Sequence, residues 1–221
     1  MPVPDQHIHE TATGAALKTV EAHSEQQDLV NPYKKEEHFL AINPKGLVPA
    51  IEYKGRALYE SLVLCEFIQD AYPEHGLNIL PTDPFERARV RLWVDHVSKA
   101  VIPASQEAEK QDTTRKELYK ALSDLSAQVK GPWFTGEDFG LVDIAIAPWT
   151  ARDYIASENR GYVRGEVGNG WKEWAERLEA RDSVVKTTSE KQYYAEIYGR
   201  YLRDEAQSEA AKATRAGRVI P

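Results

Sequence analysis

The chain has 221 residues, 42% of them hydrophobic and 29% charged, which is ordinary for a soluble protein with one large core or two small ones. Its formal net charge of −7 at pH 7 argues against a nucleic-acid or anionic-membrane partner, because both require a basic face. No apolar run could span a bilayer, the start lacks the features of a secretory signal, and Cys65 is the only cysteine, so we expect a cytoplasmic protein.

Residues 1–30 form a polar, weakly patterned leader that we expect to be poorly ordered. His7 and His9 lie close together in this leader, and His23 follows later. A structural metal site needs three or four ligands that converge on a rigid frame. The leader offers no such frame, so we expect no metal site.

The stretch NPKGLVPAIEYKGRALYES, residues 43–61, predicts a β-hairpin followed by a helix. Apolar residues within 48–51 indicate the first strand, and those within 57–59 indicate the second. Gly55 supplies the permissive backbone of the turn between them. A helix follows from Ser61 to Tyr72, with Ser61 in position to cap its N-terminus.

After a linker near residues 76–84 the apolar pattern changes from a period of two to a period of 3.6. We therefore expect an α/β N-terminal domain at 31–76 and an all-helical domain at 84–221. The segment LVDIAIAPWTARDYIA is almost wholly apolar in its first half, which is typical of a helix buried on all sides. The glycine-rich segment NRGYVRGEVGNG reads as a connection between helices.

Two pairs of residues in the hairpin region are candidates for ligand binding. Glu60 and Ser61 lie where a strand meets a helix, and the first N–H groups of a helix attract anions. A ligand carboxylate could bind there while Glu60 holds an ammonium group, which suits a zwitterionic amino-acid head. The plain alternative is a helix cap with a solvated glutamate. A cis bond between Val48 and Pro49 would present the valine backbone outward, whereas a trans edge proline is the commoner state.

The hairpin stretch, continued by LVLCEFIQDAYP, resembles the glutathione site of the cytosolic glutathione transferases, and most of all the fungal, omega-like branch. The resemblance implies that Val48 binds the cysteinyl backbone of glutathione and that Pro49 follows a cis bond. It assigns the γ-glutamyl end to Glu60 and Ser61. Glutathione is then the co-substrate.

The omega pattern also has a lysine shortly before the hairpin that contacts the glycyl end of glutathione. In this chain Lys35 of NPYKKEEHF stands in the matching place, with Lys34 as a near alternative. A solvated pair of surface charges is the plain reading of the two lysines.

The resemblance extends through the helical half and covers about residues 31–221 in all. DPFERARVRLWVDHVSKAVIPA resembles the first long helix after the linker, and GEDFGLVDIAIAPW resembles the buried helix with its capping box. Gly140 replaces the usual Ser or Thr at the cap, a change that costs only a few tenths of a kcal/mol. Asp143 is then a structural residue.

The resemblance implies a truncated thioredoxin-like α/β N-terminal domain followed by the all-α glutathione-transferase C-terminal domain. No strand–helix–strand unit is recognisable before NPYKK, and in the family that unit carries the catalytic Cys, Ser or Tyr. The catalytic residue is therefore left unassigned. Cys65 lies in an apolar stretch of the helix after Ser61, so we expect it to be buried and inert. An error in the gene model and a natural loss are the two explanations.

The resemblance implies a protein that conjugates glutathione to a small hydrophobic electrophile or exchanges thiols with it. It further implies a role in detoxification or secondary-metabolite biosynthesis, and a homodimer, since family members usually dimerise. The alternative is a catalytically inactive binding or scaffold protein, which the unrecognised first unit favours. A third reading is an isomerase that uses the pocket without a protein thiol.

Overall fold

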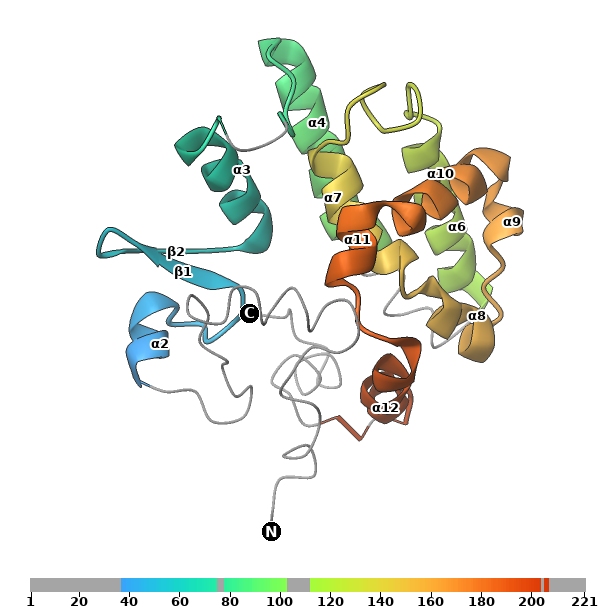
Figure 1. The fold of residues 1–221 in the computed structure, drawn as a ribbon. Helices are drawn as coiled ribbons and strands as arrows, with labels where there is room; N and C mark the ends of the chain where they lie inside the picture. The colour runs from blue at the N-terminus through green and yellow to red at the C-terminus, as the bar shows by residue number, and fades with distance from the viewer. Residues whose placement is uncertain (1–36, 75–77, 103–111, 204, 207–221) are drawn as a thin grey trace. The chain divides into compact units, whose positions relative to one another are not determined.

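The computed structural model describes residues 37–74, 78–102, 112–203 and 205–206 (Figure 1). The chain divides into two compact units. The first takes in the described residues of Met1–Leu64 and Lys186–Pro221, and the second is Cys65–Val185. The division falls inside helix α3 (Ser61–Ala71), whose first turn belongs to the hairpin unit.

The first unit is built around an antiparallel hairpin of β1 (Ala50–Tyr53) and β2 (Arg56–Tyr59), and its described residues contain no further strand. Lys54 and Gly55 form a two-residue turn with φ angles of 52° and 73°. Positive φ at both central positions is the turn geometry that matches the twist of a hairpin, and Gly55 adopts it without cost. The predicted hairpin is thus confirmed.

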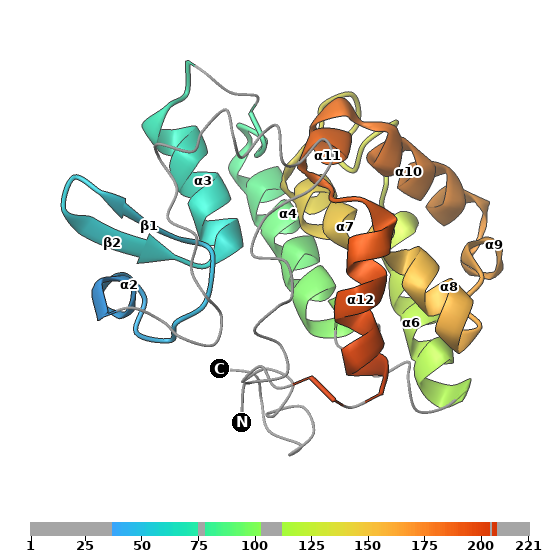
Figure 2. The same cartoon turned by 60° about the horizontal axis from the view of Figure 1, so that its bottom comes forward.

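Two helices complete the described part of this unit. Helix α2 (Glu37–Ile42) packs against both strands and buries Phe39, as Figure 2 shows beside the hairpin. Helix α12 (Lys191–Leu202) belongs to the same unit, although it lies far away in the sequence. The structure therefore groups the hairpin with α12, a grouping that the change of pattern near residue 76 did not indicate.

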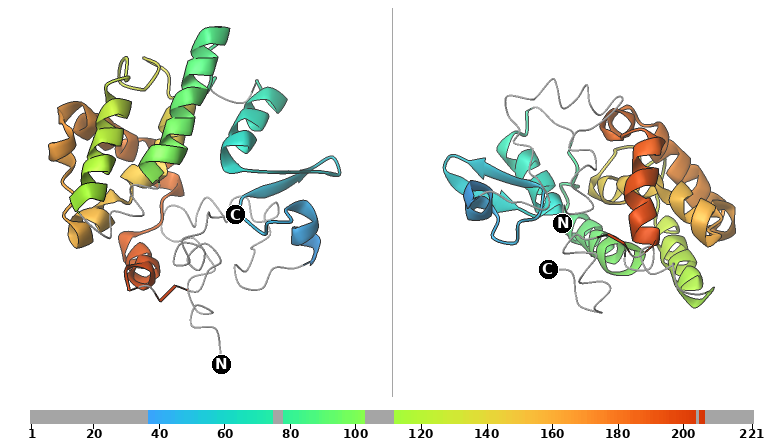
Figure 3. Two further views of the ribbon diagram at one scale, coloured as in Figure 1. Left: turned by 180° about the vertical axis from the view of Figure 1, so that it is seen from behind. Right: turned by 90° about the horizontal axis from the view of Figure 1, so that it is seen from below.

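The second unit consists of helices, and the main ones pack side by side (Figures 2 and 3). The predicted change to an all-helical half is confirmed. None of the helices formed by the described residues is long and apolar enough to cross a membrane. After α3 the helical elements are α4 (Pro84–His96), the π-helical segment η2 (Val97–Val101), α6 (Asp112–Ser126), α7 (Leu141–Thr150), α8 (Asp153–Arg160), α9 (Arg164–Val167), α10 (Asn169–Ala180) and α11 (Asp182–Thr187).

Helix α7 lies in the core of this unit and contacts α4 and α10. Most of its residues are buried, as its apolar sequence predicted, because neighbours cover it on several sides. The apolar segment is nevertheless split into α7 and α8, since the helix ends after Thr150. Trp171 and Trp174 of α10 complete this core and meet in a T-shaped contact with ring centroids 5.8 Å apart.

The long helix predicted from residue 84 changes its winding before its end. Regular α-helix stops at His96 and η2 continues to Val101, with Val97 and Val101 fully buried. Segments of π-helix are rare and often occur at functional sites. The predicted kink at Pro103 lies outside the described residues.

Candidate functional site

A buried asparagine organises the loop that leads into the hairpin. Asn43 is only 2% exposed; its Nδ2 donates to the Leu47 carbonyl at 2.7 Å, and its Oδ1 accepts from the Lys45 N–H at 3.1 Å. The Gly46 N–H also donates to the Asn43 carbonyl at 2.8 Å. These bonds hold the backbone of residues 43–47 in one conformation. The sequence analysis missed Asn43, although an Asn-Pro pair followed by glycine is a turn signal.

The loop ends at the Val48–Pro49 peptide bond, which is cis. Val48 is 67% exposed, which is unusual for a valine. The first strand begins at Ala50, directly after this bond. The residues predicted to contact the cysteinyl part of a ligand therefore lie at an open edge of the hairpin unit.

Glu60 joins the second strand to helix α3 with a left-handed backbone, φ 77°. Its carbonyl accepts the first helical hydrogen bond, from the Leu64 N–H at 2.9 Å. Glu60 therefore holds the N-cap position, and Ser61 is the first helical residue rather than the predicted cap. Non-glycine residues rarely adopt positive φ, and such strain clusters at functional sites.

The start of α3 brings a carboxylate, a hydroxyl and helix N–H groups together. Glu60 and Ser61 are both exposed, and the first N–H groups of α3 have no partner within the helix. Lys45 reaches across from the Asn43 loop, and its Nζ lies 3.3 Å from Glu60 Oε1. The site thus carries positive and negative groups side by side. Lys34 and Lys35, the predicted contacts for the glycyl end, lie outside the described residues.

Cys65 is half-buried in α3 rather than fully buried as predicted. Burial raises the pKa of its thiol, and the neighbouring Glu66 raises the same pKa further. Glu66 itself pairs with Arg91 of α4 at 2.5 Å. A thiol with a raised pKa is mostly protonated at neutral pH and is a poor nucleophile.

Asp143 acts within the core of the helical unit. Its buried carboxylate accepts hydrogen bonds from the Gly140 N–H at 2.9 Å, the Phe134 N–H at 3.1 Å and Trp174 Nε1 at 2.9 Å. Burial raises the pKa of this carboxyl group, and the hydrogen bonds oppose that rise. These contacts tie the start of α7 to α10 and to the preceding loop, which is a structural arrangement.

Gly140 at the cap of α7 also allows a close approach of the backbone of a neighbouring segment. A Cβ atom at this position would lie 3.1 Å from the Ile79 carbonyl oxygen. The same carbonyl accepts from the Leu141 N–H at 2.8 Å, so the segment before α4 runs close to the start of α7. A serine or threonine at residue 140 would crowd this approach.

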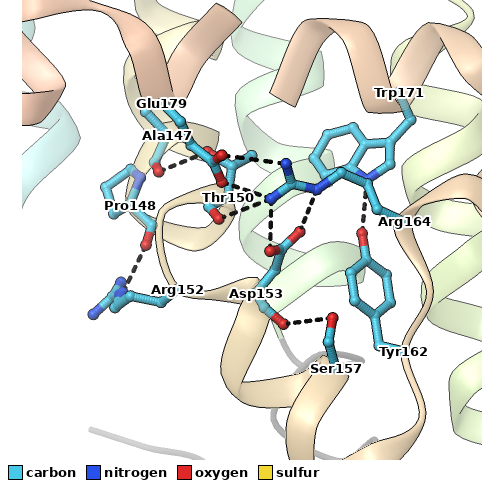
Figure 4. A network of polar contacts seen from close by, with 10 residues as sticks. All are labelled: Ala147, Pro148, Thr150, Arg152, Asp153, Ser157, Tyr162, Arg164, Trp171 and Glu179. Carbon is cyan, nitrogen blue, oxygen red and sulfur yellow. Dashed lines mark hydrogen bonds and ion pairs between the residues drawn. The ribbon is translucent and has the colours of Figure 1, made fainter. Parts of the chain in front are cut away.

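Arg164 of α9 binds two carboxylates at once (Figure 4). Its guanidinium group forms a bidentate pair with Asp153, at 2.6 and 2.9 Å, and a second pair with Glu179, at 2.6 and 3.2 Å. It also donates to the Thr150 carbonyl at 3.3 Å. All three charged side chains are at most about one-third exposed. The cluster joins α8, α9 and α10 to the end of α7.

Tyr162 packs beside this cluster and is 4% exposed. Trp171 Nε1 donates to its hydroxyl oxygen at 2.7 Å (Figure 4). Burial and the Asp153 charge raise the pKa of Tyr162, so the phenol stays neutral at physiological pH. The arrangement satisfies buried polar groups and presents no nucleophile.

The described residues contain no group of three or more His, Cys, Asp or Glu side chains that could hold a metal ion. The histidines of the leader, His7, His9 and His23, lie outside these residues. The prediction that the leader holds no metal site is therefore untested.

Comparison with known proteins identifies the family. The family model for the glutathione S-transferase N-terminal domain matches residues 9–71, and that for the C-terminal domain matches residues 92–182. The crystal structure of glutathione transferase Omega 3C from Trametes versicolor is 52% identical, with a TM-score of 0.81, over 89% of this chain and 100% of that one. The chain belongs to the glutathione transferase family and resembles its omega-like branch.

Two further proteins are similar to this chain. A probable glutathione S-transferase, parC, from Nicotiana tabacum is 29% identical over 78% of this chain and 80% of its own. Rice GST1, solved in complex with glutathione, has a TM-score of 0.73 over 81% of this chain and 86% of that one. Its identity of 24% shows a shared fold alone.

The match to the N-terminal family model reaches further forward than the motifs indicated. It begins at residue 9, whereas the sequence motifs placed the start of the resemblance near residue 31. The polar leader predicted for 1–30 therefore overlaps the region that matches the family. The predicted lack of the first strand–helix–strand unit concerns residues that lie outside the described ones.

Proposed function

We propose that this protein binds glutathione at the hairpin and the start of α3, and that it transfers glutathione to a small hydrophobic electrophile. The observation that carries the proposal is the left-handed backbone of Glu60, which accompanies an exposed carboxylate at an exposed helix N-terminus. A strained non-glycine residue in such a place is better explained by a ligand than by folding.

The groups at this site suit the γ-glutamyl head of glutathione. The helix N–H groups and the Ser61 hydroxyl donate hydrogen bonds to the α-carboxylate, because a helix N-terminus favours anions. The Glu60 carboxylate accepts the α-ammonium group. The Val48 backbone, ahead of Pro49, pairs with the cysteinyl unit as an added strand does at a sheet edge. Lys35 takes the glycyl carboxylate in the same proposal.

The chemistry is nucleophilic attack by the glutathione sulfur. In conjugation, the sulfur bonds to an electrophilic carbon, the leaving group departs with its electron pair, and the thiol proton passes to solvent. In thiol exchange, the glutathione sulfur bonds to one sulfur of a disulfide, the original S–S bond breaks, and the other sulfur leaves as a thiolate that takes up the thiol proton. The proposal gives Cys65 no catalytic role, because its thiol has a raised pKa.

A catalytically inactive glutathione-binding protein is the second candidate. It is favoured by one observation: Cys65, the single cysteine of the chain, is half-buried and has a thiol pKa above its usual value. Both candidates require the same binding site and differ only in turnover.

Calorimetry with glutathione tests the shared site. We expect the wild-type protein to bind, Glu60→Ala to bind more weakly, and Glu52→Ala to bind as the wild type does. Glu52 is an exposed carboxylate on strand β1 of the same hairpin, so it controls for the loss of negative charge. Equal binding by both variants would rule out the assigned role of Glu60.

Turnover separates the two candidates. A chloronitrobenzene electrophile reports conjugation, and a mixed disulfide reports thiol exchange. Binding with either activity supports the transferase, whereas binding without both supports the inactive relative.

The proposal includes a cytoplasmic homodimer that serves detoxification or secondary metabolism. The single cysteine and the acidic charge fit a reducing compartment without nucleic-acid partners. Phe85 and Leu92 lie seven residues apart on α4 and are 75% and 70% exposed, so an apolar face is open to a second copy. Light scattering on the purified protein gives its mass directly.

A further inference from the structure

We propose that Lys45 is a specificity-determining residue of the glutathione site, because its ammonium group occupies the Glu60 carboxylate that the ligand's α-ammonium group must use. The inference rests on the proposed function. The structural basis is the ion pair between Lys45 Nζ and Glu60 Oε1, at 3.3 Å. The pair joins the loop before Pro49 to the residue before α3, so it spans both ends of the proposed ligand contact.

The position of Lys45 is set by its backbone. The buried Asn43 side chain accepts from the Lys45 N–H at 3.1 Å and donates to the Leu47 carbonyl at 2.7 Å. The main chain of the loop is thus held, while the flexible lysine stem carries the charge to Glu60. The charge returns to Glu60 whenever no ligand competes for that carboxylate.

A ligand ammonium group can displace Lys45 from the Glu60 carboxylate. The Lys45 side chain is 46% exposed and the Glu60 side chain 56% exposed, so solvent and ligand reach both. Exposed ion pairs contribute little to stability, which means that a ligand ammonium group can displace Lys45 at small cost. Glu60, by contrast, is held in place by its left-handed backbone and by its carbonyl bond to the Leu64 N–H.

This competition changes how the protein selects ligands. In the wild-type protein a ligand that lacks the α-amine leaves the Lys45–Glu60 pair intact, so losing the amine costs less affinity than it would without Lys45. Without Lys45, no lysine ammonium group competes for the Glu60 carboxylate. The ligand amine then gains more binding free energy from that carboxylate. Lys45 therefore lowers the discrimination between glutathione and its deaminated analogue.

The experiment measures the dissociation constants of glutathione and of glutaryl-cysteinyl-glycine, which lacks only the α-amine. We expect the ratio of the two constants to rise about threefold in Lys45→Ala, a change of the size that exposed pairs produce. Lys45→Arg should restore the wild-type ratio. In a Glu60→Gln background the ratio should be near one with or without Lys45.

Lys120→Ala is the matched control. Lys120 pairs with Asp124 at 2.6 Å on an exposed face of α6, so the variant removes a similar surface pair from the other unit. It should leave the ratio unchanged. Circular dichroism on each variant verifies folding.

The outcomes distinguish this inference from the proposed function. An unchanged or lower ratio in Lys45→Ala, together with glutathione binding that depends on Glu60, overturns the role of Lys45 alone. Absence of glutathione binding by the folded wild-type protein overturns both. A raised ratio that Lys45→Arg fails to restore also contradicts the inference, because arginine offers Glu60 the same charge.

Discussion

Glu60 adopts a backbone conformation that glycine prefers. Stability would favour glycine at this residue, whereas the proposed function requires the carboxylate. The left-handed region costs an L-residue roughly 1–2 kcal/mol, whereas glycine adopts it freely. A glycine at residue 60 would relax the φ of 77° but would remove the carboxylate. The presence of glutamate here is therefore consistent with a ligand contact.

We predict that Glu60→Gly has a higher free energy of unfolding than Glu60→Ala, by about 1 kcal/mol. Both variants lose the Lys45 ion pair, so their difference isolates the backbone. Urea unfolding followed by circular dichroism measures it. The same two changes at Glu52, in the middle of β1, should give the opposite order, because glycine weakens a strand. The same order at both positions would contradict the argument.

At the scale of elements, helix α9 depends on its ion pairs. It has four residues and buries none of them, so its length does not explain its stability. Arg164 joins it to Asp153 of α8 and Glu179 of α10. The guanidinium group suits this task because it binds two carboxylates in a planar, forked geometry.

We predict that Arg164→Met lowers the free energy of unfolding by about 2–3 kcal/mol, since it leaves two half-buried carboxylates unpaired. Arg164→Lys should lose about half as much, because a point charge cannot form both bidentate pairs. Urea titration measures both losses. Lys120→Ala, which breaks an exposed pair, should change stability by less than about 1 kcal/mol. If Arg164→Met lowered the free energy of unfolding as little as Lys120→Ala does, the cluster would contribute little to stability.

The same helix shows where prediction from sequence stops. The hairpin and the long helices could be predicted, because local periodicity and turn residues determine them. The Lys54–Gly55 turn is an example. Helix α9 has no apolar period, and the glycine-rich segment NRGYVRGEVGNG was predicted to be a connection. Its ion pairs join Arg164 to residues 11 and 15 positions away. Pairing over such distances leaves no local pattern.

Some features of the candidate site could be predicted from the sequence, and others could not. Val48, Pro49, Glu60 and Ser61 form a contiguous motif, so their grouping could be predicted. The left-handed φ of Glu60 and the ion pair to Lys45 could not, because both depend on how the loop and the helix start meet. Lys35 is separated from the motif and lies outside the described residues, so its role stays a prediction.

At the scale of the whole molecule, the chain is acidic but its proposed ligand is an anion. The net charge of −7 gives no general attraction for glutathione. Binding must therefore come from local groups, namely the α3 N-terminus, Ser61 and the lysines near the hairpin. The predicted boundaries at 31–76 and 84–221 stay a division by sequence pattern. The structural units group the described residues of 186–221 with the hairpin.

The two units differ in how they gain stability. The described part of the hairpin unit has a two-stranded sheet, which is marginal by itself. The helical unit has a core of large side chains, including Trp171 and Trp174, at 2% and 0% exposure. We therefore expect the hairpin unit to open more readily by local unfolding than the helical unit.

We predict that glutathione slows amide hydrogen exchange in residues 43–64 far more than in α7 and α10. A ligand at a hundred times its dissociation constant stabilises the state that binds it by about 2.7 kcal/mol, which slows exchange through local opening about a hundredfold. Helices that open independently of the site gain none of this protection. Exchange followed by mass spectrometry, with Glu60→Ala as the control, measures both regions. Equal protection of both would mean that the two units open together, and the separate opening inferred here would be wrong.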